Sequence, residues 1–220
     1  MRKGMDENDV VLVSGMIAGE ITLDHETYGE KFYCFTLSLM RLSGTEDLLP
    51  CLIPEWLYDR EMVKPGARVK LSGQLRSYNM HTEGKSHLIL NIYAKEMEGL
   101  SGCGGLFCNY IHLKGFLCKA PVYRITSKGK EITDCLLAVN LPYGKSAYIP
   151  CIFWGALARR TGNLCVGEEI ELSGRMQSRA YRKEKETKNR VAYEVSVSEL
   201  WGCGGKESLC AEEGSGVDEL

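Results

Sequence analysis

The sequence predicts an all-β chain in which one small barrel occurs twice in tandem. First, apolar and polar residues alternate over long stretches, as in Phe35, Leu37 and Leu39, which is the period of a half-buried strand. Second, the sequence matches itself when it is shifted by about 100 residues. Third, 220 residues with 44% apolar and 25% charged residues have ordinary globular composition and suffice for two domains of about 100 residues each.

The repeat is an ordered series of matches along the chain. Pro50-Cys51 matches Pro150-Cys151, and the stretch 71–73 (LSG) matches 172–174 (LSG) after one inserted residue. The stretch 100–105 (LSGCGG) then matches 200–205 (LWGCGG). This series predicts an N-terminal tail at 1–8, repeat 1 at 9–100, a Gly/Cys hinge at 101–108, repeat 2 at 109–201 and an acidic C-terminal tail at 202–220.

Each repeat has the same order of elements. In repeat 1, alternation predicts strands at 10–22, 30–42, 48–53, 67–78 and 86–97, with a short helix at 54–62. In repeat 2 it predicts strands at 109–118, 130–141, 147–153, 168–178 and 190–198, with a short helix at 155–162. Five strands with a helix between the third and the fourth is the layout of an OB-fold barrel. We therefore expect two tandem five-stranded OB-fold barrels.

The composition also bears on compartment and redox state. No apolar run approaches the ~18 residues of a membrane helix. The N-terminal stretch carries Asp6, Glu7 and Asp9 and does not have the pattern of a signal peptide, so we expect a cytoplasmic protein without a membrane partner. In that compartment the 10 cysteines are expected to be reduced and mostly buried, rather than paired in a disulfide framework.

The net charge of −2 and the pI near 6.1 would by themselves argue against binding to nucleic acid. The distribution of charge changes this conclusion. Repeat 1 has 9 basic and 13 acidic residues, repeat 2 has 15 and 9, and the C-terminal tail has 1 and 5. The local charges are therefore −4, +6 and −4, and phosphate binding depends on the local charge.

Three stretches are distributed along repeat 2: 109–115 (NYIHLKG), 148–158 (YIPCIFWGALA) and 167–181 (GEEIELSGRMQSRAY). With them, repeat 2 resembles the bacterial single-stranded-DNA-binding protein family. Repeat 1 matches more loosely, through 13–15 (VSG) and 66–77. The resemblance implies non-enzymatic, largely sequence-independent binding of single-stranded DNA in replication, recombination or repair. Primosomal replication proteins share the fold, and they leave open an interaction or scaffold protein with weak or lost DNA binding.

Aromatic and basic residues of repeat 2 are the candidates for binding, because bases stack on rings and phosphates attract Lys and Arg. Tyr148 and Trp154 share one face of a strand by its period of two. The resemblance implies that these two and Tyr181 are stacking positions. The candidate phosphate contacts are Lys114, Arg124, Lys128, Lys130, Arg175, Arg179, Arg182 and Lys183. A core role for the rings, and a solvated loop for the basic run 182–190, are the alternatives.

Repeat 1 lacks rings at the corresponding positions, where it has Leu48, Pro54 and Met80. Weaker candidates at other positions are Tyr33, Trp56, Arg76 and Tyr78. We therefore expect repeat 2 to provide most of the affinity for single-stranded DNA. Repeat 1 is expected to be structural or a weaker contact. RNA is not excluded, because stacking surfaces accept both nucleic acids.

Other motifs give weaker signals. Cys103, Cys108, Cys203 and Cys210 lie beside glycines and could form a zinc site, but their spacings are not C-x2-C and no His is near. Sharp turns after the last strands explain these glycines more simply. The four histidines are scattered, and no catalytic arrangement stands out, so we expect neither an enzyme nor a cofactor.

The acidic tail lacks the apolar Pro-Phe tip with which the family recruits repair and replication proteins. Such partners remain possible, and the tail could instead compete for the binding groove. Two-domain proteins resembling this chain form homodimers with four barrels. We expect the same here.

Overall fold

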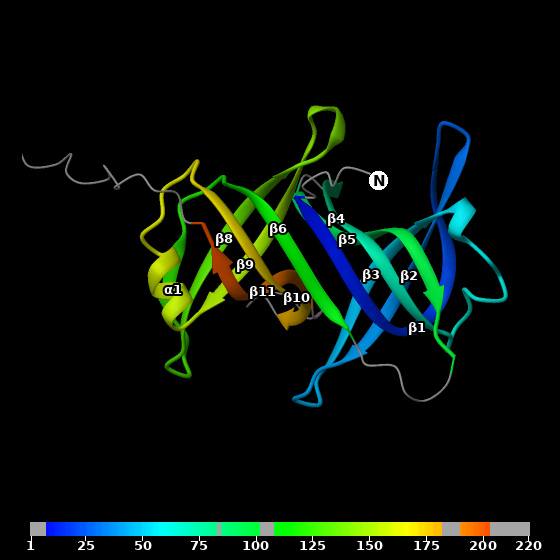
Figure 1. Cartoon of the computed structure of the whole chain (residues 1–220), viewed down its shortest axis with the longest axis horizontal. Helices are drawn as coiled ribbons and strands as arrows, with labels where there is room; N and C mark the ends of the chain where they lie inside the picture. Colours follow the sequence, from blue (N-terminus) through cyan, green and yellow to red (C-terminus); the bar gives the residue numbers. More distant parts are fainter. Residues whose placement is uncertain (1–7, 83–84, 102–107, 182–189, 203–220) are drawn as a thin grey trace, which may run out of the picture.

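A computed structural model describes residues 8–82, 85–101, 108–181 and 190–202 (Figure 1). Its first half contains β1 (Asp9–Thr27), β2 (Glu30–Met40), β3 (Glu46–Pro54), the 3-10 helix η1 (Glu55–Leu57), β4 (Arg68–Thr82) and β5 (Lys85–Gly99). The second half contains β6 (Asn109–Leu117), β7 (Val122–Ile125), β8 (Glu131–Asn140), η2 (Pro142–Gly144), β9 (Ser146–Trp154), α1 (Ala156–Thr161), β10 (Glu169–Tyr181) and β11 (Arg190–Trp201). None of the described helices is long and apolar enough to span a membrane.

The strands of each half close into a barrel. In repeat 1, β1 pairs with β2 and β4, β2 pairs with β3, and β5 pairs with β3 and β4. In repeat 2, β6 pairs with β8 and β10, β8 pairs with β9, and β11 pairs with β9 and β10. The pairs β3–β5 and β9–β11 are parallel and the others are antiparallel. The predicted all-β fold of OB-type barrels is thereby confirmed.

The ten predicted strands are all present, and the largest difference is at β1, which ends at 27 instead of 22. The added residues form an exposed hairpin arm with the start of β2. Because neither face of this arm is buried, its sequence has no alternation of apolar and polar residues that would predict a strand. The short strand β7, paired with β8, was not predicted, because its four residues are all exposed.

The helical segments differ between the repeats. In repeat 2, α1 at Ala156–Thr161 agrees with the predicted 155–162. In repeat 1, only η1 forms, and it is much shorter than the predicted 54–62. There, the Asp59 carboxylate accepts a hydrogen bond from the Glu61 N–H at 2.9 Å. Such a local side-chain bond offers the backbone an alternative to the helix.

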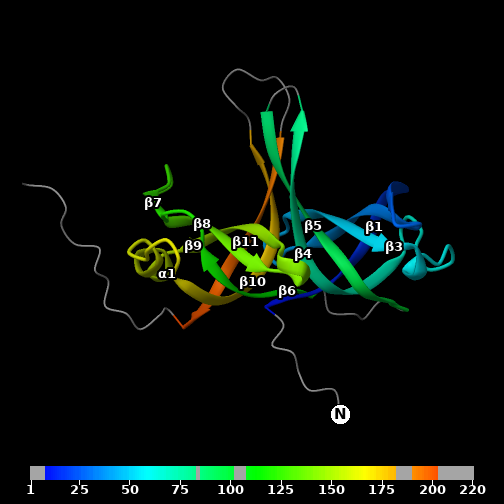
Figure 2. The ribbon, with the colours of Figure 1, turned by 90° about the horizontal axis from the view of Figure 1, so that it is seen from above.

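The two barrels join through β1 and β6, which lie side by side in the centre of Figure 1. Their antiparallel register places Val11 opposite Ile111, and these residues are counterparts in the two repeats. A residue that pairs with its own counterpart marks a pseudo-two-fold axis. The same symmetry brings the β4–β5 and β10–β11 hairpins next to each other, as Figure 2 shows.

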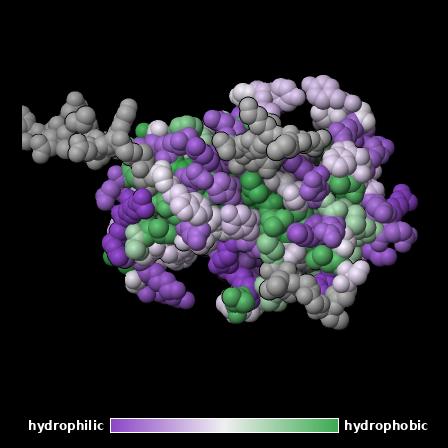
Figure 3. Space-filling model, in the orientation of Figure 1, coloured by the Kyte–Doolittle hydropathy of each residue, from purple (hydrophilic) through white to green (hydrophobic). Residues whose placement is uncertain are grey.

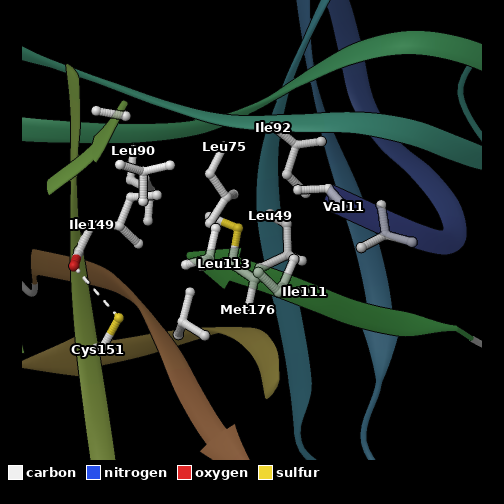
Figure 4. Close-up of a cluster of buried hydrophobic side chains, with 14 of the residues drawn as sticks. Val11, Leu49, Leu75, Leu90, Ile92, Ile111, Leu113, Ile149, Cys151 and Met176 are labelled. Carbon is white, nitrogen blue, oxygen red and sulfur yellow. Dashed lines mark hydrogen bonds between the residues drawn. The ribbon is translucent and has the colours of Figure 1, made fainter. Parts of the chain in front are cut away.

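One hydrophobic core extends through both barrels (Figure 4). The side chains labelled there come from both repeats: Val11, Leu49, Leu75, Leu90, Ile92, Ile111, Leu113, Ile149, Cys151 and Met176. Cys51, Cys135 and Cys151 are buried and unpaired, as predicted for small apolar residues, and Cys34, Cys108 and Cys118 are unpaired but only partly buried. Cys165 is disulfide-bonded, which contradicts the expectation that the cysteines are all reduced. Burial raises the pKa of the Cys135 thiol to about 12.

Glycines that recur in the two repeats occupy places where strands approach closely. A Cβ added to Gly15 would collide with the Ser38 carbonyl oxygen. A Cβ added to Gly115, its counterpart, would collide with the Ala138 carbonyl oxygen. These glycines are therefore required by the closure of each barrel, between β1 and β2 and between β6 and β8.

Candidate nucleic-acid interface

Trp154 lies at the end of β9 on the outer face of repeat 2, with 38% of its surface exposed. Its indole Nε1 donates a hydrogen bond to the Ser196 hydroxyl of β11 at 3.1 Å. This bond connects two strands that pair only at Cys151 and Ile152, and it fixes the orientation of the ring. A partly exposed ring that is already held in place can stack on a base without losing much side-chain freedom.

A cavity of about 480 Å³ opens beside this ring. Its walls are formed by Arg41, Lys130, Trp154, Arg175, Gln177, Ser178, Arg179 and Ser196. Four of these residues are cations, and three of the four were predicted phosphate contacts. The structure therefore brings Trp154, Lys130, Arg175 and Arg179 together around one space. We call this space the basic cavity.

Two carboxylates moderate the charge of the basic cavity. Glu194 is buried, accepts a hydrogen bond from the Gln177 amide at 2.8 Å, and lies 3.5 Å from Arg179 Nε. Asp47, from repeat 1, lies 3.9 Å from Arg175 Nη1. Both acids are nearly inaccessible to solvent, whereas the cations are partly exposed, so an approaching phosphate meets mainly positive charge.

Arg41 reaches the basic cavity from the other repeat, and sequence reasoning missed it. It lies in the turn between β2 and β3, and its Nε donates to Asp47 Oδ2 at 2.6 Å. Its Nη2 donates to Asp47 Oδ1 at 2.5 Å and to the Ser178 carbonyl oxygen at 3.0 Å. The repeat gave no signal for it, because its counterpart in repeat 2 is Leu141.

Asp47 is completely buried where the two repeats meet. Its Oδ1 accepts hydrogen bonds from the Ser178 N–H at 2.7 Å and from the Ser178 hydroxyl at 3.0 Å. Burial would raise the pKa of this carboxyl, but the hydrogen bonds from Arg41 and Ser178 outweigh burial and hold the pKa below its ordinary value. Asp47 is therefore ionised at neutral pH and fixes Arg41 against repeat 2.

Tyr181 and Tyr148 do not share the basic cavity with Trp154. Tyr181 lines a second cavity of about 770 Å³ between the β4–β5 and β10–β11 hairpins. The Arg179 guanidinium lies 5.9 Å from the centroid of the Tyr181 ring, and Arg179 lines both cavities. Tyr148 is 42% exposed and lines a third cavity together with Leu88 of repeat 1. The three predicted rings thus line three adjoining cavities, of which the first two share Arg179 and the last two share Leu88.

The remaining predicted cations of repeat 2 lie outside the basic cavity. Lys114 Nζ is 3.7 Å from Glu169 Oε2, between β6 and β10. Arg124 on β7 donates from Nε to Asp134 Oδ2 at 2.7 Å, and Lys128 is exposed in the turn before β8. Arg182 and Lys183 lie outside the described residues.

The weaker candidates of repeat 1 fall into two groups. Tyr33 stacks on Tyr58 with ring centroids 4.2 Å apart and packs against the core, and Trp56 is 65% exposed in η1. Arg76 and Tyr78 lie on the outer face of β4, and the Arg76 guanidinium is 5.5 Å from the centroid of the Tyr93 ring. Only the second group lies on the face that corresponds to the basic cavity.

The zinc hypothesis rests on residues that are mostly not described. Cys103, Cys203 and Cys210 lie outside the described residues. The Cys108 thiol lies 3.4 Å from the Leu12 carbonyl oxygen and donates to it. Across 8–82, 85–101, 108–181 and 190–202, no group of His, Cys, Asp or Glu side chains could hold a metal ion.

Comparison with known proteins gives a consistent result. Residues 108–201 match the Single-strand binding protein family. A curated relative, the "Single-stranded DNA-binding protein" of Clostridium tetani (strain Massachusetts / E88), is 33% identical over 105 residues, covering 43% of this chain and 72% of that protein.

Solved structures extend the likeness to both repeats. The wild-type single-stranded DNA binding protein from Thermus aquaticus has a TM-score of 0.68 at 18% identity, covering 93% of this chain and 96% of that chain. This shows that the two share a fold. The N-terminal domain of the PriB protein from Thermoanaerobacter tencongensis is 38% identical and covers 44% of this chain and 100% of that chain, with a TM-score of 0.38. At this score the likeness supports no structural inference.

Proposed function

The chain belongs to the single-strand binding protein family, and from this premise we propose that it binds single-stranded DNA without catalysing a reaction. The observation that supports this most is the basic cavity. There a half-exposed Trp154 ring lies beside Arg41, Lys130, Arg175 and Arg179. A ring accepts the face of any base, and the cations neutralise phosphates. Both contacts are independent of sequence, so we propose little sequence preference.

Within this function, we propose that repeat 2 provides most of the affinity. Its local charge is +6 against −4 for repeat 1, and the ring at Trp154 is replaced by Pro54 in repeat 1. We place the function in the cytoplasm, in replication, recombination or repair, where single strands arise. RNA is the competing ligand, and titration with oligo(rU) measures the preference.

The test is the affinity of the whole protein for fluorescein-labelled oligo(dT), measured by anisotropy. Trp154→Ala is expected to weaken binding by ~1–3 kcal/mol, the value of one stacked base, which corresponds to a loss of about 5- to 150-fold. The matched control is Trp201→Ala, because Trp201 is 43% exposed on β11 but lines none of the three cavities. This control is expected to bind as the wild type does.

Duplex DNA and added salt complete the test. We expect weaker binding to duplex DNA and a steep loss of oligo(dT) affinity as salt rises, because phosphate contacts release counterions. A wild-type protein that binds oligo(dT) no better than duplex would contradict the proposal. That result would favour the scaffold alternative.

We also propose a homodimer with four barrels. Met16 on β1, and Tyr110 and Phe116 on β6, are exposed on the outer face of the junction between the repeats. Figure 3 shows apolar side chains at the centre of this face. Light scattering after size exclusion is expected to give twice the chain mass of 24.6 kDa, and a mass equal to one chain would contradict the dimer.

A further inference from the structure

The outer face of repeat 1 carries a row of aromatic rings. His25 on β1 stacks on Phe32 of β2 with centroids 4.7 Å apart and 10° between the ring planes. Phe32 lies 6.3 Å from Tyr93 of β5, tilted by 40°. The Arg76 guanidinium of β4 lies 5.5 Å from the centroid of the Tyr93 ring. Four strands thus contribute to one continuous surface of rings and a guanidinium.

This row flanks the position at which repeat 1 lacks the tryptophan. Pro54 is the counterpart of Trp154, and Phe32 pairs directly opposite Pro54 on the neighbouring strand. Tyr93 pairs with Gln74 as Ser196 pairs with Arg175 in repeat 2. Because Gln74 and Arg175 are counterparts, Tyr93 takes the place of Ser196, the partner of the Trp154 indole.

The rings of this row are accessible. His25 is exposed, Phe32 and Tyr93 are half-buried, and Tyr78 on the same face of β4 is 49% exposed. The core of repeat 1 is filled by other side chains, among them Ile92, the inward-facing neighbour of Tyr93. A row of partly open rings outside the core has the geometry on which bases stack.

We propose that His25, Phe32, Tyr78 and Tyr93, with Arg76, form a second stacking site for the bases of single-stranded nucleic acid, in repeat 1. The proposal rests on the proposed function. Repeat 1 was expected to be structural or a weaker contact, and the proposal gives it a site made of different residues from those of repeat 2. The sequence indicated Arg76 and Tyr78 but not His25, Phe32 and Tyr93, because the contacts between these three rings join three different strands.

The surroundings of this site give it a distinctive property. The Asp24 carboxylate is 2.6 Å from His25 Nδ1, and Lys31 is paired with Glu55 at 3.7 Å. Burial first, and then the charge of Glu30, raises the pKa of Tyr93. With acids beside the rings and a repeat charge of −4, few counterions are released when a strand binds there. Binding at repeat 1 is therefore driven by stacking and depends little on salt.

The experiment compares oligo(dT) of two lengths on the full chain. One OB-fold accommodates ~4–16 nucleotides, so an oligonucleotide of about 8 nucleotides fills the basic cavity alone, and one of about 40 exceeds both barrels. Phe32→Leu and Tyr93→Leu remove a ring but keep apolar bulk. The matched control is Trp201→Leu, since Trp201 is 43% exposed on β11 and lines none of the three cavities.

We expect each ring variant to lose about 5- to 150-fold in affinity for the long oligonucleotide, the effect of one stacked base. The affinity for the short oligonucleotide is expected to be unchanged. The slope of log K against log salt is also expected to be unchanged. A variant that only destabilised the fold would weaken both lengths, and circular dichroism detects this directly. If Phe32→Leu disturbs the hairpin arm, Tyr93→Leu still tests the site.

Three outcomes overturn the proposal in distinguishable ways. If folded variants bind the long oligonucleotide as tightly as the wild type while Trp154→Ala binds weakly, repeat 1 has no stacking site and the proposed function stands. If the wild type binds neither length, the proposed function fails and this site fails with it. Loss of the short oligonucleotide alone in both ring variants would also contradict the assignment to repeat 1.

Discussion

Replacement of Asp47 by alanine should destabilise the whole chain, because this carboxylate holds the two repeats together. It is completely buried on β3 of repeat 1, yet its partners Arg41 and Ser178 come from both repeats. Asp47→Ala leaves the Ser178 N–H without its acceptor and the Arg41 guanidinium without its counter-ion. Both effects lower the free energy of unfolding, in addition to the loss of the hydrogen bonds that the carboxylate accepts.

The magnitude follows from the burial of each partner. A buried donor without an acceptor costs ~1–3 kcal/mol. Breaking a buried ion pair costs ~3–5 kcal/mol. The Arg41 side chain is 21% exposed, so water can solvate it in the variant, and the lower part of that range applies. We expect a loss of about 3 kcal/mol of unfolding free energy, which for a chain of this size lowers Tm by roughly 6–12 °C.

The assay is thermal unfolding followed by circular dichroism across a range of pH. The folded-state pKa of Asp47 is lowered, so its stabilisation is present above the unfolded pKa of ~3.9 and is lost as the pH falls through the folded value. The difference in Tm between the wild type and Asp47→Ala should therefore be constant near neutral pH and should shrink below about pH 4. The Tm of Asp47→Asn, which keeps an acceptor for Ser178 but not the charge, should lie between the Tm values of the wild type and Asp47→Ala.

The control is Glu61→Ala, because the Glu61 side chain is 92% exposed and its pairing with Lys64 is a surface contact. Its Tm should stay near that of the wild type, since exposed pairs contribute little. An Asp47→Ala protein with a Tm as high as this control would refute the reasoning. So would a difference between wild type and Asp47→Ala that is as large at pH 3 as at pH 7.

Three further outcomes are expected. Gly115→Ala should lower stability by ~1–3 kcal/mol in urea unfolding, because its Cβ would overlap the Ala138 carbonyl oxygen, and unchanged stability would contradict this close approach. The Cys135 thiol, whose pKa burial raises to about 12, should react with a thiol reagent near pH 8 only after unfolding; labelling of the native protein at that position would disprove its burial. Arg175→Gln should reduce the salt slope of oligo(dT) binding by ~0.7, the value of one phosphate, whereas Lys114→Gln should leave it unchanged.

The fold was largely predictable because its signals are local and occur twice. Alternation along 30–42 and 130–141 located β2 and β8 within two residues, and the second copy checked each assignment. The arm at the end of β1 and the short strand β7 were missed, since both are exposed and lack one-sided burial. The helix of repeat 1 was overestimated, because a side-chain bond from Asp59 competes with it.

The candidate site was predictable only within repeat 2. The period of two located Trp154 on the outer face, and Arg175 and Arg179 were candidates as cations on the same strand as Tyr181. Arg41 could not be found in this way, because it enters the basic cavity from a turn of the other repeat. Nor did the sequence show that Tyr148 would face repeat 1, where its N–H donates to the Ser77 hydroxyl at 2.6 Å. Contacts across a junction depend on register between distant strands, which single-sequence patterns do not contain.

At the junction, the backbone hydrogen bonds are symmetric between the two repeats, but the charged side chains are not. The Leu48 N–H donates to the Ser178 hydroxyl at 3.3 Å, and the Tyr148 N–H donates to the Ser77 hydroxyl, so the same bond is made on both sides of the pseudo-two-fold axis. Next to it, Asp47 faces repeat 2, whereas its counterpart Ala147 offers repeat 1 no charge.

The asymmetry at the junction determines which repeat has an additional cation on its outer face. With Asp47 in place, Arg41 is held in the wall of the basic cavity, whereas Leu141 brings no such charge to the face of repeat 1. The junction thus places a cation of the acidic repeat, paired with the buried Asp47, in the wall of the cavity of the basic repeat. In the binding that we propose, repeat 1 contributes in two ways that need no net positive charge of its own: it supplies Arg41 to its neighbour, and it presents rings on its own outer face.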